Sequence, residues 1–414
     1  MKENIVKLEN IRSLMYTNKR KLKLKGEKMR NKSLKTVTVL TALTYIVLNM
    51  AHPVTPMFIT QNKLPSYLFG VFFAAMSIGN FIFSPIWGKL SDKGGRIKFM
   101  ILGILGYGVS QIGFGFSSNP IIIVLWRFIG GASVISFLTV ILAYIADITD
   151  EEGRLKGMTY YAAASTFGGA IGSLLGGVIG NTDYKITFSV QFILSIIICI
   201  LFYLFLEETV TPKSKVEVQD KKNNVREVKV LNPKIIFIMS QVVVFFFATT
   251  SYNSSINYYI ESVLALPPTV NGIFLAVAGI FGFLINILFT GMLAKRFGEV
   301  KALRISGISM ALCIGGATLF KLVPLFFLFI LLFVGSAAVY QPMLQNIISK
   351  VSNKDNGKVA GIQNSARAIG MIMGSLYSGF IFAYGSKLPF ISAAIVVFIG
   401  YLIFKLGHKK YNII

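Results

Sequence analysis

The stretch Gly88-Lys-Leu-Ser-Asp-Lys-Gly-Gly-Arg96 is a short polar turn that joins two long apolar runs. Three cations in it surround a single carboxylate, Asp92, and its paired glycines can adopt the positive φ angles that larger residues resist. A degraded copy, Gly291-Met-Leu-Ala-Lys-Arg-Phe-Gly298, follows 203 residues later in the same setting. The repetition predicts a chain built from two similar halves.

The composition around these turns is that of a membrane protein. Of the 414 residues, 54% are hydrophobic and only 14% are charged, and the mean hydropathy is +0.68. Serial membrane spans need this balance, whereas a soluble domain does not. The net charge of +24 would suit nucleic acid, but the cations lie in short loops between apolar runs instead of on one amphipathic face. We therefore expect a polytopic membrane protein with no nucleic-acid partner.

Few residues are available for metal or redox chemistry. Cys199 and Cys313 both lie inside apolar segments, so neither a disulfide framework nor a zinc site is expected. His52 and His408 are the only histidines, which leaves little for a metal centre. We expect no metal and no cofactor.

Twelve apolar segments are each long enough to span a bilayer, which takes about 20 helical residues. We therefore predict an all-α membrane protein with twelve transmembrane helices in two pseudo-symmetric six-helix bundles. The predicted spans are residues 36–59, 66–90, 97–117, 120–147, 157–181, 186–206, 234–260, 269–294, 301–320, 323–349, 358–384 and 388–406. The first bundle covers residues 30–206 and the second covers residues 234–406. A charged linker (207–233) joins them, and a tail (407–414) follows.

The distribution of Lys and Arg predicts the orientation of the chain. One side of the membrane receives only Lys63, Lys185, Lys321 and Lys387, and Arg127 and Arg367 lie within spans. The other side receives the remaining 35 of the 41 cations, and the positive-inside rule assigns that side to the cytoplasm. Both termini and the linker are therefore expected in the cytoplasm.

The N-terminal extension, residues 1–29, has two interpretations. Its first 28 residues carry nine Lys/Arg against three Glu and lack the apolar core of a signal peptide. Lys25-Gly-Glu-Lys-Met29 is what a purine-rich ribosome-binding site followed by a start codon would encode, so the extension could be untranslated sequence. The alternative is a basic arm on the membrane surface.

The two halves also repeat within their spans. Gly172-Ser-Leu-Leu-Gly-Gly177 matches Gly374-Ser-Leu-Tyr-Ser-Gly379 at an offset of 202 residues, and Gly131 roughly matches Gly335. A duplicated six-helix unit is typical of secondary transporters, whose substrate site lies between the halves near the middle of the membrane.

These residues resemble the major facilitator superfamily, specifically its twelve-span drug:proton antiporter branch, over residues 30–406. The 88–96 turn is similar to the superfamily's loop 2–3 motif, and Leu125-Trp-Arg-Phe-Ile-Gly-Gly131 resembles its span-four motif. Gly168-Gly-Ala-Ile-Gly-Ser-Leu-Leu-Gly-Gly177 resembles the span-five antiporter motif, and Asn364-Ser-Ala-Arg-Ala-Ile-Gly370 resembles span eleven of bacterial efflux members. The resemblance implies the major facilitator fold and, more weakly, drug export.

One departure weakens the antiporter motif. Ser173 stands where that family usually has proline, and Ser375 repeats the departure in the second half. Loss of the proline should straighten the helix. The glycines of this motif and its repeat admit close helix approach, and in the family this face forms the interface between the halves. These glycines are Gly168, Gly172, Gly176, Gly177, Gly374 and Gly379.

The resemblance implies that Asp92 caps helix dipoles of span three or eleven and joins Arg96 and Asp147 in a charge network that latches the cytoplasmic side shut. The residues agree, since Asp92 has helix ends and cations nearby. Ordinary loop charges are the simpler interpretation. The candidate latch residues are Gly88, Asp92, Gly95, Arg96, Asp147 and Arg154.

Candidates for proton coupling are few, because all 17 Asp/Glu fall in loops, tails or span ends. Arg127 lies about 10 Å below the outer surface, where a cation should face a cavity or a partner unless it snorkels outward. The resemblance implies a role for it in proton transfer or anion binding. His52 is the only group within the spans that titrates near neutrality. Glu261, at the outer end of span seven, is the nearest acid, unless it is simply an exposed loop residue.

The substrate pocket follows from the spans that face the cavity in this fold, which are one, four, seven and ten. Uncharged amides and aromatic rings there suit an amphipathic organic molecule. A helix-packing role is the alternative for each residue, and snorkelling is the alternative for Arg367 in span eleven. The candidates are Asn49, His52, Arg127, Tyr252, Asn253, Asn257, Tyr258, Tyr340, Gln341, Gln345 and Arg367.

We therefore predict a secondary active transporter that exports small amphipathic compounds, such as drugs, by proton-driven alternating access. A transporter of a specific sugar, peptide or siderophore is the alternative on the same fold, and Arg127 with Arg367 would suit anionic or neutral cargo. A membrane enzyme would need convergent catalytic groups, and the sequence does not show them. A channel would need a repeated filter, which the sequence also lacks. We expect a functional monomer in the bacterial plasma membrane, with the lipid bilayer and a small-molecule substrate as its partners.

Overall fold

The computed structural model describes residues 33–210, 233–320, 322–352 and 356–411, and all regular structure within these ranges is helical. Eleven of the described helices are long and apolar enough to cross a membrane. A twelfth long helix, α14 (Asn356–Phe382), carries Arg367 and several small residues and is less apolar. The expected all-α membrane fold is therefore confirmed. The N-terminal extension and most of the 207–233 linker lie outside the described residues.

The first half contains six spans. The first, Ser33–Gln61, is helical over residues 33–49 and continues through a short 3-10 turn, η1 (His52–Val54), into α2 (Thr55–Gln61). The others are α3 (Leu68–Gly94), α4 (Arg96–Phe116), α5 (Pro120–Ile148), α6 (Glu151–Ile179) and α7 (Tyr184–Phe205). Three of these helices begin at side-chain caps, which satisfy N–H groups left free in the first turn. The capping residues are Asn119, Asp150 and Asp183.

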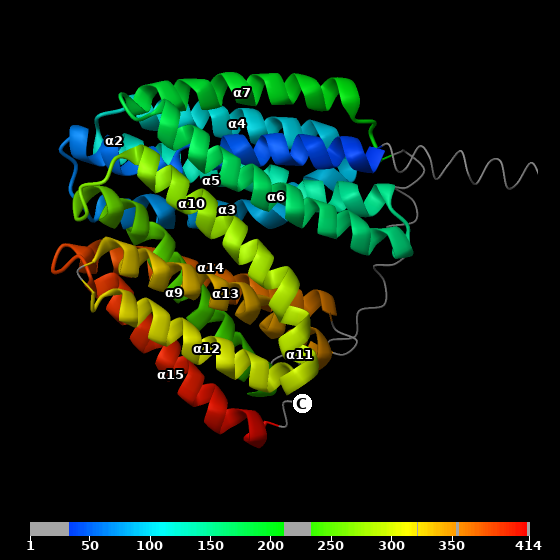
Figure 1. Ribbon diagram of the computed structural model, residues 1–414. Helices are drawn as coiled ribbons and strands as arrows, with labels where there is room; N and C mark the ends of the chain where they lie inside the picture. Colours follow the sequence, from blue (N-terminus) through cyan, green and yellow to red (C-terminus); the bar gives the residue numbers. More distant parts are fainter. Residues whose placement is uncertain (1–32, 211–232, 321, 353–355, 412–414) are drawn as a thin grey trace, which may run out of the picture.

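The second half repeats this order of elements. Its helices are α9 (Pro233–Ser262), α10 (Pro268–Ile285), η2 (Asn286–Thr290), α11 (Gly291–Phe297), α12 (Glu299–Ala317), α13 (Val323–Ser352), α14 and α15 (Leu388–Lys410). Proline opens both α9 and α10, where its missing N–H has no partner to lose. The segment η2 is a π-helical turn that continues α10 into α11 as one span. Figure 1 shows this half, coloured green to red, below the first.

Each half packs around its own apolar core. In the first half α5 packs between α3 and α4, and α7 covers α4; in the second half α9 packs on α14 and α15, and α12 packs on α13 and α15. The halves meet along two helix pairs, α6 with α10 and α3 with α14. Glycine permits both contacts, because a Cβ at Gly70 or Gly177 would overlap backbone atoms of the opposite half.

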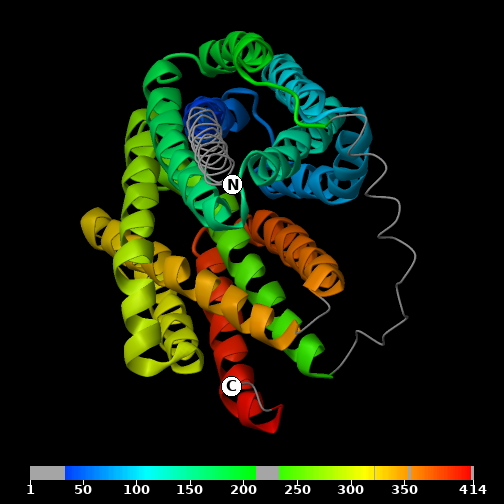
Figure 2. The ribbon, with the colours of Figure 1, turned by 90° about the vertical axis from the view of Figure 1, so that its right-hand side faces the viewer.

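Contacts between the halves concentrate at one end of the molecule. There the rings of Tyr67 and Phe380 stack 5.5 Å apart, Thr269 Oγ1 donates to Asn181 Oδ1 at 2.9 Å, and Asn271 Nδ2 donates to the carbonyl of Pro53 at 3.4 Å. We name this the closed end; it carries the loops 62–67, 180–183, 263–267 and 383–387. The opposite end, which carries the turns at Gly95 and Gly298, is the open end. Figure 2, turned by 90°, views the two halves from the right-hand side of Figure 1.

Candidate functional site

A cavity of about 460 Å³ lies between the two halves, within the usual range for a small-molecule site. The first span, α3 and α6 supply one wall, and α9 and α10 supply the other. None of the described residues that line it is Asp or Glu. Its polar side chains are amides, hydroxyls and one imidazole. They are Tyr45, Asn49, His52, Ser165, Thr166, Ser173, Asn253 and Asn257.

Four of the predicted binding residues line this cavity. Asn253 and Asn257 are four residues apart on α9 and therefore share a helix face. Asn257 is buried, and no described residue donates a hydrogen bond to its Oδ1. Asn49 donates from Nδ2 to the carbonyl of Tyr45 at 2.8 Å, and its amide lies beside Gly169 of α6. His52 stacks on Phe73, with ring centroids 6.1 Å apart.

The three predicted tyrosines lie elsewhere. Tyr252 packs on Phe333 in the core of the second half, with ring centroids 5.1 Å apart. Tyr340 is also buried there, and its hydroxyl donates to Gln241 Oε1 at 3.3 Å. Tyr258 packs at the junction of the halves instead, against Phe69 of α3. None of the three is among the residues that line the cavity.

The remaining binding candidates lie outside the cavity wall. Gln341 and Gln345 are exposed on α13, and Gln345 Oε1 accepts a hydrogen bond from Gln363 Nε2 at 2.5 Å. Arg367 is exposed on α14, with its guanidinium 4.9 Å from the ring centroid of Phe246. It is close enough to Tyr45 and Tyr161 in the first half to interact electrostatically with both.

Sequence reasoning missed the Tyr45–Tyr161 pair. Their hydroxyls share a hydrogen bond of 2.7 Å between the first span and α6. Tyr45 lies one helical turn before Asn49 and could have been found from that spacing, because residues four apart share a face. Tyr161 could not, because α6 was not among the spans expected to face the cavity. The pair and Arg367 place two hydroxyls and one cation beside the space between the halves.

Arg127 points into the protein and does not snorkel. It is only 9% exposed, its Nη2 donates to Thr55 Oγ1 at 3.3 Å, and its guanidinium lies 3.5 Å from the ring centroid of Phe114. Its Nε has no acceptor among the described residues. Arg127 also interacts electrostatically with His52, which links the cavity wall to this buried cation.

Glu261 lies at the closed end of α9 and is partly buried. No described residue donates a hydrogen bond to its Oε2, and the carboxylate is near the backbone N–H of Met57 in α2. The side chain therefore reaches the other half and is not a free loop residue.

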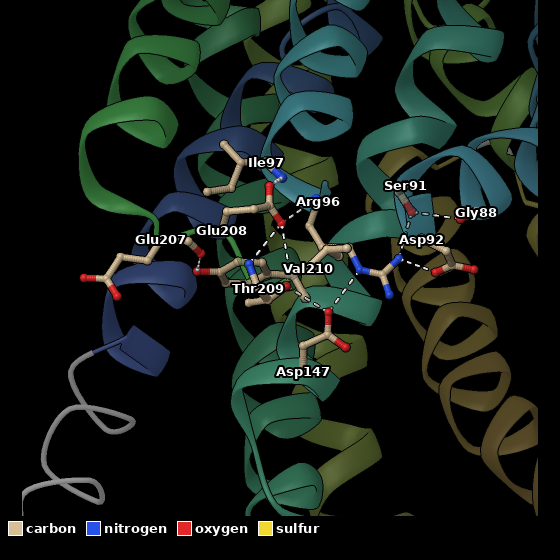
Figure 3. Close-up of polar contacts among 11 residues, drawn as sticks. Gly88, Ser91, Asp92, Arg96, Ile97, Asp147, Glu207, Glu208, Thr209 and Val210 are labelled. Atoms are coloured by element: carbon tan, nitrogen blue, oxygen red, sulfur yellow. Dashed lines mark hydrogen bonds and ion pairs between the residues drawn. The ribbon is translucent and has the colours of Figure 1, made fainter. Parts of the chain in front are cut away.

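Three of the six candidate latch residues, Asp92, Arg96 and Asp147, form a compact cluster at the open end (Figure 3). Arg96 donates to Asp92 Oδ1 at 2.6 Å and to Asp147 Oδ2 at 3.0 Å, which ties the ends of α3, α4 and α5 together. Gly95 has φ = 99°, a conformation that favours glycine, and precedes Arg96 in the turn. Gly88 lies in α3 and faces Thr139 of α5, whereas Arg154 is exposed on α6 and outside the cluster.

Glu208 completes this cluster and was missed by sequence reasoning. Its carboxylate accepts hydrogen bonds from the N–H groups of Arg96 (2.8 Å) and Ile97 (3.1 Å) and so caps α4, which has no side-chain cap of its own. At span three, Glu208 therefore fills the capping role that was expected of Asp92. Burial raises the pKa of Glu208, but four backbone donors outweigh it and hold the pKa below its usual value. These donors are Arg96, Val210, Ile97 and Thr209.

The second half carries an ion pair of reversed polarity at the corresponding place. Glu299 Oε1 accepts hydrogen bonds from Lys350 Nζ at 2.7 Å and from Asn346 Nδ2 at 2.6 Å. Glu299 and Lys350 stand 203 residues after Arg96 and Asp147, so the cation and the anion have exchanged positions. We name these two contacts the inverted ion pairs.

The predicted interface glycines divide between two kinds of contact. A Cβ at Gly168, Gly172 or Gly176 would overlap carbonyl oxygens of the first span, so these three pack within their own half. Gly374 packs in the same way on Phe247 of α9. Only Gly177 and Gly379 of the six meet the opposite half.

Comparison with known proteins agrees with this architecture. The family model of the Major Facilitator Superfamily matches residues 37–375 and 243–411. Multidrug resistance protein 2 of Bacillus subtilis is 25% identical over 375 residues, covering 89% of this chain and 93% of that protein. The class H tetracycline resistance protein of Pasteurella multocida is 26% identical and covers 86% and 90%.

Solved structures share the fold. A bacterial homolog of the human lysosomal transporter Spinster, in an inward-facing and occupied conformation, superposes with a TM-score of 0.74 at 13% identity, covering 92% of this chain and 97% of that one. The duplicated six-helix halves, the 88–96 turn and the matched family model lead to one conclusion: the chain belongs to the Major Facilitator Superfamily and is a multi-pass membrane transporter of small molecules.

Proposed function

We propose that this protein is a proton-coupled exporter of small amphipathic organic compounds, such as drugs, that works by alternating access. The observation that carries the proposal is a cavity between two helical halves, lined by amides, hydroxyls and aromatic rings from both. Its relatives include proteins named for multidrug and tetracycline resistance. Transport of a specific metabolite on the same fold is less well supported by these names.

We infer that the open end faces the cytoplasm, because it receives nearly all of the loop Lys and Arg residues. Both termini would then be cytoplasmic. The halves are in contact at the outer end, so the cavity would load from inside the cell, as an exporter requires. We expect a monomer in a bacterial plasma membrane, because each protomer contains a complete cavity.

His52 is the proton carrier that we propose. It lines the cavity and interacts with Arg127, so its protonation adds a second positive charge beside a buried cation. Glu261 is the second candidate, since its orphaned oxygen is at the junction of the halves. Either group would couple the proton gradient to the balance between two conformations.

The cluster around Arg96 is the conformational latch that we propose. In this structure its ion pairs lie within the first half, between α3, α4 and α5. Of the three ion-paired residues Asp92 has the most exposed side chain, with 56% of it accessible, and is therefore free to find a further partner when the open end closes. The latch would supply about 1–3 kcal/mol, the usual range for coupling between conformational states, which is enough to bias two states of similar energy.

The function is tested by a drug-susceptibility panel in a host that lacks its own exporters, with and without a protonophore. We expect the chain to raise resistance to several amphipathic compounds and the protonophore to remove the gain. The controls are an empty vector and an Asp92→Asn variant with its membrane level measured. Unchanged susceptibility across the panel, with the protein present in the membrane, would favour the metabolite transporter.

A further inference from the structure

A second cavity, of about 570 Å³, lies entirely within the second half at its open end. It is lined by α11, α12, α15 and the end of α13 and shares no lining residue with the central cavity. Its polar walls are strongly basic. They include Glu299, Lys301, Arg304, Lys350 and His408.

Two of these cations have no acidic partner within the part of the chain that the structure describes. Lys350 is neutralised by Glu299 at 2.7 Å, which leaves Lys301 and Arg304 as the net charge of the cavity. The Nε of Arg304 is buried and has no acceptor among the described residues. A buried donor without an acceptor costs free energy, so a ligand that accepts this hydrogen bond would be stabilised.

The geometry of the two cations suits a phosphate group. Lys301 and Arg304 are three residues apart on α12 and share one face of the helix. A planar guanidinium donates two parallel hydrogen bonds to phosphate oxygens, and an adjacent ammonium adds charge. Lys301 also lies over the ring of Phe297, 5.5 Å from its centroid, which keeps the ammonium beside the cavity.

The surroundings of the cavity are apolar and exposed. Ile305 and Leu312 of α12 are 38% and 65% exposed, and the neighbouring α15 exposes Leu402 and Leu406. In a membrane protein such surfaces face acyl chains. A phosphate held in the cavity would therefore lie at the end of a lipid-covered groove, at the level where headgroups begin.

We propose that this cavity binds the phosphate headgroup of an anionic phospholipid of the cytoplasmic leaflet. Arg304 and Lys301 bind the phosphate, and the exposed faces of α12 and α15 contact the acyl chains. The assignment to this leaflet uses the orientation inferred above, but the site itself is independent of what the central cavity transports.

The internal duplication supplies a matched control. Lys98 and Ile101 stand 203 residues before Lys301 and Arg304, at the same place in the first half. The first half therefore keeps one cation there but has an apolar side chain in place of the arginine. Lys98→Gln removes one positive charge at the same depth of the fold, as Lys301→Gln does, without changing the proposed site.

The test uses the full-length protein in a neutral detergent with dioleoyl-phosphatidylglycerol and dioleoyl-phosphatidylcholine. Both lipids carry the phosphodiester, but the choline cation of the second would lie beside Lys301 and Arg304 and be repelled by them. Bound lipid is counted by native mass spectrometry, and the melting temperature is a second readout. We expect at least about tenfold tighter retention of phosphatidylglycerol by the wild-type chain and by Lys98→Gln. The double variant Lys301→Gln/Arg304→Gln should retain both lipids equally.

Three results would overturn the proposal. One is equal retention of the two lipids by the wild-type chain, and another is an unchanged preference in the double variant. The third is full displacement of phosphatidylglycerol by millimolar inorganic phosphate, which would point to a soluble phosphate ligand instead. If the double variant fails to fold, Arg304→Lys serves in its place. It keeps the charge but loses the fork of donors, and we expect it to retain an intermediate preference.

Discussion

Replacing Asp92 by Asn separates the latch hypothesis from simple structural support. Among the described residues Asp92 forms an ion pair with Arg96 alone, at 2.6 Å, and 56% of its side chain is exposed. Arg96 would keep Asp147 at 3.0 Å and Ser91 Oγ at 2.8 Å. An exposed pair of this kind contributes about 0.5–1 kcal/mol, so the stability of this conformer should fall by no more than that amount.

The same free energy sets the scale for transport. A loss of about 1 kcal/mol changes a two-state equilibrium by about fivefold. If Asp92 gains a further partner when the open end closes, losing a latch of about 1–3 kcal/mol should reduce transport by more than fivefold, and by up to about 150-fold, while the protein stays inserted. Dye efflux from everted vesicles measures transport, and thermal unfolding in detergent measures stability. Glu207→Gln is the control, because it neutralises another exposed carboxylate beside this cluster. A transport loss of fivefold or less would refute the latch.

Four further outcomes are expected. Glu208→Gln should lower the melting temperature above pH 4.5, because a depressed pKa stabilises the fold above the unfolded value of 4.5. The difference in melting temperature between the wild-type chain and this variant should vanish as the pH falls through the pKa of Glu208 in the folded state. An unchanged difference at pH 3 would contradict the prediction. Glu299→Lys and Lys350→Glu should each lower the free energy of unfolding by about 1 kcal/mol, and the double exchange should restore the melting temperature. Failure of the double exchange to restore it would disprove the pairing. Arg367→Gln should reduce export of anionic fluorescein several-fold and spare cationic rhodamine 123, whereas equal losses would argue against a charge effect. His52→Gln should abolish the dependence of transport on the pH gradient while substrate binding, measured by fluorescence quenching, persists. Normal coupling in this variant would indicate that Glu261 carries the proton instead.

The overall fold could be predicted because apolar length and charged turns determine it. Each span needs about 20 apolar residues, and turns such as Gly88–Arg96 interrupt them. The division at the 207–233 linker follows from the same reasoning. Helix α14 is less apolar and is not among the eleven helices that qualify as spans by length and composition, although the sequence predicts a span at residues 358–384.

The facing of side chains could not be predicted in the same way. In a membrane both the lipid and the protein core are apolar, so the pattern of hydrophobic residues does not show which face of a helix meets a cavity. Asn253 and Tyr252 are neighbours, yet only Asn253 lines the cavity. Likewise Gly172 packs on its own half and Gly177 on the other, although they stand five residues apart.

Contacts between residues far apart in the sequence could not be predicted either. Glu208 caps a helix that begins 112 positions before it, and no local motif records that relation. The Tyr45–Tyr161 bond likewise joins residues 116 positions apart. Such contacts follow from the packing of whole helices.

The inverted ion pairs bear on how a duplicated chain folds without confusing its halves. Helices α4 and α12 are similar, and so are their partners α5 and α13, so mistaken pairing is a hazard during membrane insertion. If α4 packed on α13, Arg96 would meet Lys350; if α12 packed on α5, Glu299 would meet Asp147. Both mistakes bring like charges together, and each correct pairing joins opposite ones. Because the cation and the anion have exchanged positions between the halves, electrostatics favours the correct helix pairing within each half.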